Sequence, residues 1–271
     1  MKQYPHIISE LFHKPLLITQ ARHAAIVRIL EARIEGGSTD RRAEIEVNPP
    51  DESEQDPAVQ VFGPCAIIPV HGVVTRYASD IPASSCGCGM DVVSAMIDEA
   101  QADRSVQTIL FDFRTPGGSV NGIPEMAAKI ASSRKQTVAF TGSECCSAGV
   151  WLATQCQSFF CSPSATVGSI GVWTAYADLT KQMKKEGVAI QSISAGKYKL
   201  MGAYWKPLSD EEKAMLQADV DKIYAQFKDA VNARRQVDDE FMNGQVFDGE
   251  KACEIGLCDG LIDEIGELIE D

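Results

Sequence analysis

From Pro64 onward, short apolar segments alternate with longer amphipathic ones, and this alternation constrains the fold more than any other feature. Strands are predicted over Ala66–Val74, Thr108–Phe113, Thr137–Thr141, Ser158–Cys161, Val167–Val172 and Ala189–Ser194. Helices are predicted over Met90–Asp103, Val120–Ser133, Ser147–Thr154, Asp178–Glu186 and Ser209–Arg235. Strands separated by helices imply crossover connections, which give a largely parallel sheet covered by helices. The pattern therefore predicts an α/β fold.

The chain before Pro64 has a different character. Residues 1–33 predict a helical N-terminal segment, with helices over Ile7–Phe12 and Thr19–Arg33. Residues 34–63 are polar, acidic and rich in Gly and Pro, which is typical of a flexible linker. We therefore expect residues 64–271 to form the functional domain.

Composition excludes several classes of function. The net charge of −13 argues against a general nucleic-acid binder and against docking on an anionic membrane. The nine cysteines form no CxxC pair and no histidine lies near the later ones, so we expect no zinc site. Cys86-Gly87-Cys88 could bind a metal or form a redox pair, but a flexible loop with free thiols is the simpler interpretation. We expect no metal and no cofactor. The odd number of cysteines, in a chain with no recognisable secretory signal, fits a reducing, cytoplasmic location. The uncharged stretch from Cys145 to Ala177 is broken by turn residues, so it predicts buried core and not a membrane span.

The cluster Cys146-Ser147-Ala148-Gly149 is a candidate nucleophile site in a chain with no histidine after His71. A serine needs a nearby base, and His71 lies in a strand-like run. If Ser147 is a nucleophile, its base is therefore expected to be a lysine, and the segment 195–201 offers Lys197 and Lys199. The simpler interpretation of Ser147 is a helix N-cap, and most lysines are merely solvated.

A second candidate element follows the strand that ends at Phe113. The turn Arg114-Thr115-Pro116-Gly117-Gly118-Ser119 opens into a predicted helix. Glycines in such a turn let backbone N–H groups approach a ligand, which suits an oxyanion hole. A plain tight turn explains the same residues, and the phosphate-loop pattern is missing.

Four motifs occur in this order along the chain: Thr115-Pro116-Gly117-Gly118-Ser119, Cys146-Ser147-Ala148-Gly149, Val167-Gly168-Ser169-Ile170-Gly171-Val172 and Gly196-Lys197-Tyr198-Lys199. Taken together, they resemble the signal peptide peptidase A (protease IV) family of Ser–Lys peptidases. The resemblance runs from about Ala66 to Ile265. The N-terminal segment, from Tyr4 through Leu16-Leu17-Ile18, looks like the branch of bacteriophage head-maturation proteases.

The resemblance implies a Clp protease–crotonase fold and a role for each matching residue. Ser147 would be the nucleophile and Lys199 the general base, with Lys197 as the rival base. Ser169 would hydrogen-bond the lysine, and the N–H groups of Gly117 and Gly118, with that of Ala148, would form the oxyanion hole. The sequence departs from the family after the lysine, where Ala203-Tyr204-Trp205 precede Pro207.

The resemblance also implies an assembly and a substrate. Family members form rings, in some of which serine and lysine come from neighbouring subunits. The expected partners are phage or prophage scaffold, portal or capsid proteins, processed in the host cytoplasm or the immature head. Alternatives are a peptidase for signal-peptide remnants, a crotonase-type acyl-CoA enzyme and a non-catalytic scaffold protein.

Overall fold

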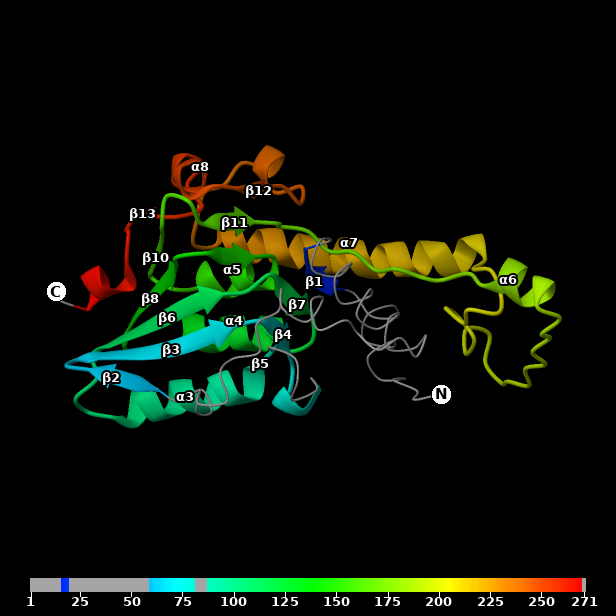
Figure 1. Cartoon of the computed structure of the whole chain (residues 1–271), viewed down its shortest axis with the longest axis horizontal. Coiled ribbons are helices and arrows are strands. Elements are labelled where there is room, and N and C mark those ends of the chain that lie inside the picture. The colour runs from blue at the N-terminus through cyan, green and yellow to red at the C-terminus, as the bar shows by residue number, and fades with distance from the viewer. Residues whose placement is uncertain (1–15, 20–58, 81–86, 270–271) are drawn as a thin grey trace, which may run out of the picture.

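A six-stranded sheet forms the centre of the computed structural model, which describes residues 16–19, 59–80 and 87–269 (Figure 1). Its order is β13-β10-β8-β6-β3-β2, and every neighbouring pair is parallel except β2 with β3. The strands are β2 (Gln60–Phe62), β3 (Cys65–His71), β6 (Thr108–Arg114), β8 (Gln136–Thr141), β10 (Ser158–Cys161) and β13 (Gly260–Leu261). The predicted α/β fold with a largely parallel sheet is confirmed.

Residues of β6 alternate between the two faces of this sheet, as the two-residue period of a strand requires. Ile109, Phe111 and Phe113 join the main core with α3 (Met90–Ala102), α4 (Ile123–Ala131) and α5 (Ala148–Ala153). Leu110 belongs to a smaller cluster on the opposite face, against which the C-terminal 3-10 turn η3 (Ile265–Leu268) packs. Helices therefore cover one face, and the chain's last described turn contributes to covering the other.

Two small sheets continue the central strands at their carboxyl ends. One has the order β1-β7-β4-β5, and the other has the order β12-β11-β9. Their strands are β1 (Leu16–Ile18), β4 (Val73–Thr75), β5 (Gly87–Gly89), β7 (Gly117–Ser119), β9 (Glu144–Cys146), β11 (Thr166–Gly168) and β12 (Val246–Phe247). Strands β4, β7, β9 and β11 follow closely after β3, β6, β8 and β10. The sequence motifs are thereby gathered at one end of the central sheet.

The long helix α7 (Asp210–Asn232) runs past this end of the sheet, with α6 (Thr180–Lys185) near its start (Figure 1). Ser209 and Glu212 form the capping box that the sequence predicts, with reciprocal side-chain bonds to backbone N–H groups. Near the other end, Phe227 stacks on Trp151 of α5 with ring centroids 4.8 Å apart. Helix α8 (Gly249–Glu254) and the short 3-10 turns η1 (Ala78–Asp80) and η2 (Asp239–Phe241) complete the elements.

Four sequence predictions need correction. The strand predicted over Ala66–Val74 is two strands, because Gly72 at φ 83° turns the chain between β3 and β4. The strand predicted over Val167–Val172 ends at Gly168, after which the chain no longer pairs as a strand. The segment Ala189–Ser194 is not a strand but an exposed, irregular connection. The last residues of the predicted linker 34–63 form β2.

Further predictions fall on residues that the structure leaves undescribed. The helix over Ile7–Phe12 and nearly all of the one over Thr19–Arg33 lie outside the described residues. Between these two predicted helices, residues 16–18 form β1, a strand that the sequence did not predict. None of the helices in the described part of the chain has the length and apolar character to cross a membrane.

Candidate active site

Ser147 lies at the sharp turn between β9 and α5. It is 1% exposed and has φ 53° and ψ −113°, a backbone conformation that costs a non-glycine residue energy unless its surroundings fix it. Its N–H donates to the Gly168 carbonyl at 2.8 Å, and its carbonyl accepts from the Trp151 N–H at 3.1 Å. Ser147 occupies the N-cap position of α5, but its side chain makes no capping hydrogen bond. Helix capping therefore does not account for this residue.

The glycine turn after β6 packs directly against the serine turn. Thr115, which is buried, donates its N–H to the Glu144 carbonyl at 2.8 Å and accepts from the Cys146 N–H at 2.9 Å. Gly117 has φ 102°, and a Cβ at that position would lie 2.9 Å from the Ser147 Cβ. Gly149 approaches Thr115 even more closely, since a Cβ at Gly149 would lie 2.5 Å from the threonine Cγ2. The two motifs form one structural unit.

The expected oxyanion-hole groups differ in their surroundings. The Gly117 N–H donates to Thr115 Oγ1 at 3.1 Å, within its own turn. Gly118 is a strand residue of β7, opposite Leu17 on one side and Val74 on the other. Ala148 is the first residue of α5, so its N–H has no acceptor within the helix. All three are next to Ser147 in sequence or in the adjoining turn.

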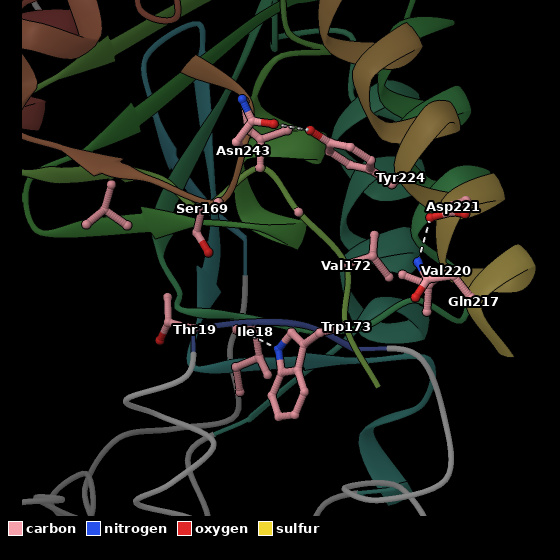
Figure 2. A pocket seen from close by; sticks show the side chains of 14 residues that line it. Ile18, Thr19, Ser169, Val172, Trp173, Gln217, Val220, Asp221, Tyr224 and Asn243 are labelled. Carbon is pink, nitrogen blue, oxygen red and sulfur yellow. Dashed lines mark hydrogen bonds between the residues drawn. The ribbon is translucent and has the colours of Figure 1, made fainter. Parts of the chain in front are cut away.

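Ser169 directly follows β11 and has φ 57°, the other positive φ among the described non-glycine residues. The bond between Ser147 N–H and the Gly168 carbonyl brings its segment beside the serine turn. Ser169 lines a cavity of ≈ 600 Å³ that also has Thr19, Asp221 and Tyr224 in its wall. Figure 2 shows its hydroxyl directed toward the side on which Ile18 and Thr19 lie.

The structure does not bring Lys199 to this place. Lys199 is exposed in the connection between α6 and α7, whose Lys197 ammonium lies 2.6 Å from the Glu211 carboxylate in the first turn of α7. Helix α5 instead packs near the other end of α7, against Phe227. At a rise of 1.5 Å per residue, Glu211 and Phe227 are ~24 Å apart along the helix axis. In Figure 1 this connection lies at the end of α7 away from α5.

The rival bases are both engaged elsewhere. Hydrogen bonds with Glu211 and then Tyr198 raise the pKa of Lys197, which opposes a role as a neutral base. His71 lies at the end of β3, as predicted, with Nε2 2.9 Å from the Asp112 carboxylate.

Strand β1 is the part of this region that sequence reasoning missed. It lies beside the glycine turn, with Leu17 opposite Gly118 and Ile18 opposite Gly117. The only signal in the sequence is the apolar run Leu16-Leu17-Ile18, which by itself fits a strand, a helix or a loop equally well.

Comparison with known proteins identifies relatives of this chain. A family model described as "Peptidase family S49" matches residues 129–269. "Capsid assembly protease C" of Escherichia phage lambda is 28% identical over 280 residues, which cover 97% of this chain and 64% of the relative. "Head-tail preconnector protein GP5" of Enterobacteria phage P21 is 26% identical, covering 95% of this chain and 55% of the relative. The chain thus spans less than two thirds of the length of these phage relatives.

Among solved structures, a serine-to-alanine mutant of the "1510-N membrane-bound stomatin-specific protease" aligns with a TM-score of 0.43 and 14% identity, covering 78% of this chain and 85% of that one. An enoyl-CoA hydratase/isomerase family member aligns with a TM-score of 0.40 and 14% identity, covering 79% and 71%.

Proposed function

This chain belongs to peptidase family S49, and from that premise we propose that it is a serine endopeptidase with Ser147 as nucleophile and Lys199 as general base. The observation that carries the proposal is the conformation of Ser147. Its positive φ, its bond to Gly168 and its contact with Gly117 hold a serine against a glycine turn without giving it a capping role. Strain of this kind is concentrated at functional sites.

The proposed reaction is acyl transfer through an acyl-enzyme. Neutral Lys199 takes the proton of Ser147, whose oxygen attacks the scissile carbonyl carbon. N–H groups of Gly117, Gly118 and Ala148 are the donors proposed for the resulting oxyanion. The Lys199 ammonium then protonates the leaving amine, and water hydrolyses the ester. For Gly117, donation to the oxyanion requires that its N–H exchange Thr115 Oγ1 for the substrate oxygen.

Because Lys199 lies before the first turn of α7, while α5, which begins after Ser147, packs against Phe227 near the far end of that helix, we propose that each active site combines two subunits. Three apolar side chains in the same connection between α6 and α7 support this arrangement, since Val188, Ile190 and Ile193 are exposed, and Ile193 is 102% exposed. Exposed apolar side chains grouped in one segment are typical of a surface that a partner covers. The cavity beside Ser169 has room for a lysine delivered from outside the chain, with the Ser169 hydroxyl positioned to hold its ammonium.

The phage relatives indicate the class of substrate. Both names refer to the building of a virus head, and both proteins align with nearly the whole of this chain. We propose that this peptidase processes scaffold, portal or capsid proteins of a phage or prophage, in the host cytoplasm or the immature head. The peptidase domain would then include β2 at residues 60–62 and, from the N-terminal segment, β1 at residues 16–18.

An active-site-directed reagent tests the proposed function. A fluorophosphonate should label the wild-type protein at Ser147 and should fail to label the Ser147→Ala and Lys199→Ala variants. Labelling should rise toward alkaline pH, because the base must be neutral. Labelling that persists in Lys199→Ala, or is equal at acidic and alkaline pH, contradicts a lysine base. A protein that the fluorophosphonate does not label and that binds coenzyme A would instead be a crotonase-type enzyme.

A further inference from the structure

Strand β1 is bound on both of its edges, as an added peptide strand would be. On one edge it pairs antiparallel with β7, so that Leu16 faces Ser119 and Leu17 faces Gly118. On the other edge, Leu16 exchanges two backbone hydrogen bonds with Trp173, at 2.8 and 3.2 Å. The Trp173 indole N–H also donates to the Ile18 carbonyl at 3.0 Å. Pairing of backbone groups on both edges is how proteins hold an extended peptide.

The same strand passes directly over the proposed nucleophile. The Leu17 carbonyl carbon and the Ser147 Cβ both lie 2.9 Å from the point that a Gly117 Cβ would occupy, so the two atoms are at most twice that distance apart. Ser147 is 1% exposed, so a substrate cannot reach it in this arrangement. Access to the serine therefore requires that something nearby move.

Departure of β1 would leave the serine turn intact, although it would expose the buried side chains of Leu16, Leu17 and Ile18. Strand β1 is the last strand in the order β1-β7-β4-β5, and β7 remains paired with β4 through Gly118 and Val74 when β1 is removed. In contrast, Thr115 and Gly168 are tied to the serine turn by backbone bonds.

We call the space that β1 occupies between β7 and Trp173 the peptide channel. The side chains of β1 show which residues this channel accepts. Leu16, Leu17 and Ile18 are 5%, 0% and 4% exposed, so three consecutive residues are enclosed. Leu17 is part of the main core cluster, together with Val74 and Ile170. Ile18 lines the same cavity as Ser169 (Figure 2). Enclosure of three successive apolar side chains favours an apolar peptide and disfavours a charged one.

We propose that β1 is an intramolecular ligand of the peptide channel of Ser147, and that the channel takes an extended segment with three consecutive apolar residues. This inference rests on the proposed peptidase function. It adds a class of substrate, apolar peptides, and identifies β1 as a competitor of that substrate. A tethered ligand competes at the effective concentration set by its linkage, so a substrate must displace β1 before it reaches the serine.

A disulfide between β1 and β7 tests the displacement. Leu16 and Ser119 are directly opposite in an antiparallel ladder, at a separation compatible with a disulfide. The Leu16→Cys, Ser119→Cys double variant would be assayed oxidised and reduced, with a fluorogenic peptide that contains Leu-Leu-Ile and with a small fluorophosphonate. Each single-cysteine variant, treated with the same oxidant, is the control for the native cysteines.

We expect oxidation to slow peptide hydrolysis of the double variant by at least about tenfold, and a reductant to restore it. Equal hydrolysis by the oxidised and reduced forms overturns the inference, because the substrate would then reach Ser147 without displacing β1. A reduced protein that reacts with the fluorophosphonate but does not cleave the peptide also overturns the inference while sparing the peptidase. A reduced protein that neither reacts with the fluorophosphonate nor cleaves the peptide overturns the proposed function itself.

A second measurement needs no variant. The wild-type protein should cleave a peptide containing Leu-Leu-Ile with a kcat/KM at least about tenfold above that for Leu-Asp-Ile, since the central side chain is enclosed. Equal values contradict an apolar channel, even if the disulfide does not form.

Discussion

The carbonyl carbon of Leu17 and the Cβ of Ser147 converge on one point beside Gly117, each 2.9 Å from the place where a Cβ would be. A glycine is required there, because its φ of 102° and the Leu17 carbonyl oxygen, 2.0 Å from the same point, leave no room for a side chain. The glycine turn, the serine and β1 therefore depend on one another.

Replacing Gly117 should damage both stability and activity. Gly117→Ala has to adopt a positive φ and displace Leu17, so we expect a loss of about 1–3 kcal/mol in the free energy of unfolding, together with loss of fluorophosphonate labelling. Urea denaturation measures the first and mass spectrometry the second. Gly63→Ala is the matched control, because Gly63 also has a positive φ but has nothing within 4 Å of its Cβ position. Equal effects of the two substitutions would contradict the close approach of β1 and the serine turn.

The stack of Trp151 on Phe227 should be a main anchor of α7. Phe227 is fully buried, so Phe227→Ala should reduce the free energy of unfolding by about 3–5 kcal/mol. Met215 is on the same helix but is partly exposed, and Met215→Ala should cost less than about 1 kcal/mol. Chemical denaturation of both variants makes the comparison. Similar losses in the free energy of unfolding for the two variants would contradict the role of the Phe227–Trp151 stack in anchoring α7.

Asp112 should make stability depend on pH. Burial alone would raise the pKa of its carboxyl, but hydrogen bonds from His71 and the charge of Arg114 outweigh burial and lower it. A carboxyl with a lowered folded-state pKa stabilises the fold above its unfolded pKa of about 3.9, and this contribution is lost as the pH falls through the folded value.

The Asp112→Asn variant should accordingly lose about 1.5–3 kcal/mol near neutral pH, and its deficit relative to wild type should narrow as the pH falls below about 4. Asp98→Asn is the control, since that carboxylate pairs with Lys129 on the surface and should contribute less than about 1 kcal/mol. Urea titrations across the pH range test this. A deficit that is independent of pH would rule out the ionised carboxylate as its source.

The sequence predicted the fold well where local pattern and burial agree. The bounds of the segments Ser158–Cys161 and Met90–Asp103 were predicted almost to the residue. A strand or helix that buries one face shows the period of that element in the spacing of its apolar residues. The segment Ala189–Ser194 has the same β-branched character but no sheet beside it, so the prediction of a strand there was wrong. Propensity is overridden when no partner strand is present.

The candidate site was only partly predictable, because some of its residues belong to local motifs and others are brought there by long-range pairing. Residues close in sequence to Ser147 were found from motifs, and the structure places Gly117 and the Ser169 segment beside it. The position of β1 could not be predicted, because its pairing with β7 joins segments about 100 residues apart and leaves no local pattern. The position of Lys199 relative to Ser147 depends on how the connection between α6 and α7 is placed in the fold, which motif spacing does not reveal.

Mixing two inactive variants tests most directly whether two subunits build each active site. Ser147→Ala and Lys199→Ala, carrying different tags, would be co-expressed and assemblies containing both isolated through the two tags. A Lys197→Ala protein, which removes the rival lysine, serves as the active control. If serine and lysine come from different chains, the mixed assemblies should recover between about one half of wild-type activity, for a dimer, and about one quarter, for a large ring, because that fraction of sites pairs an intact Ser147 with an intact Lys199. Mixed assemblies that stay as inactive as either parent would contradict the account.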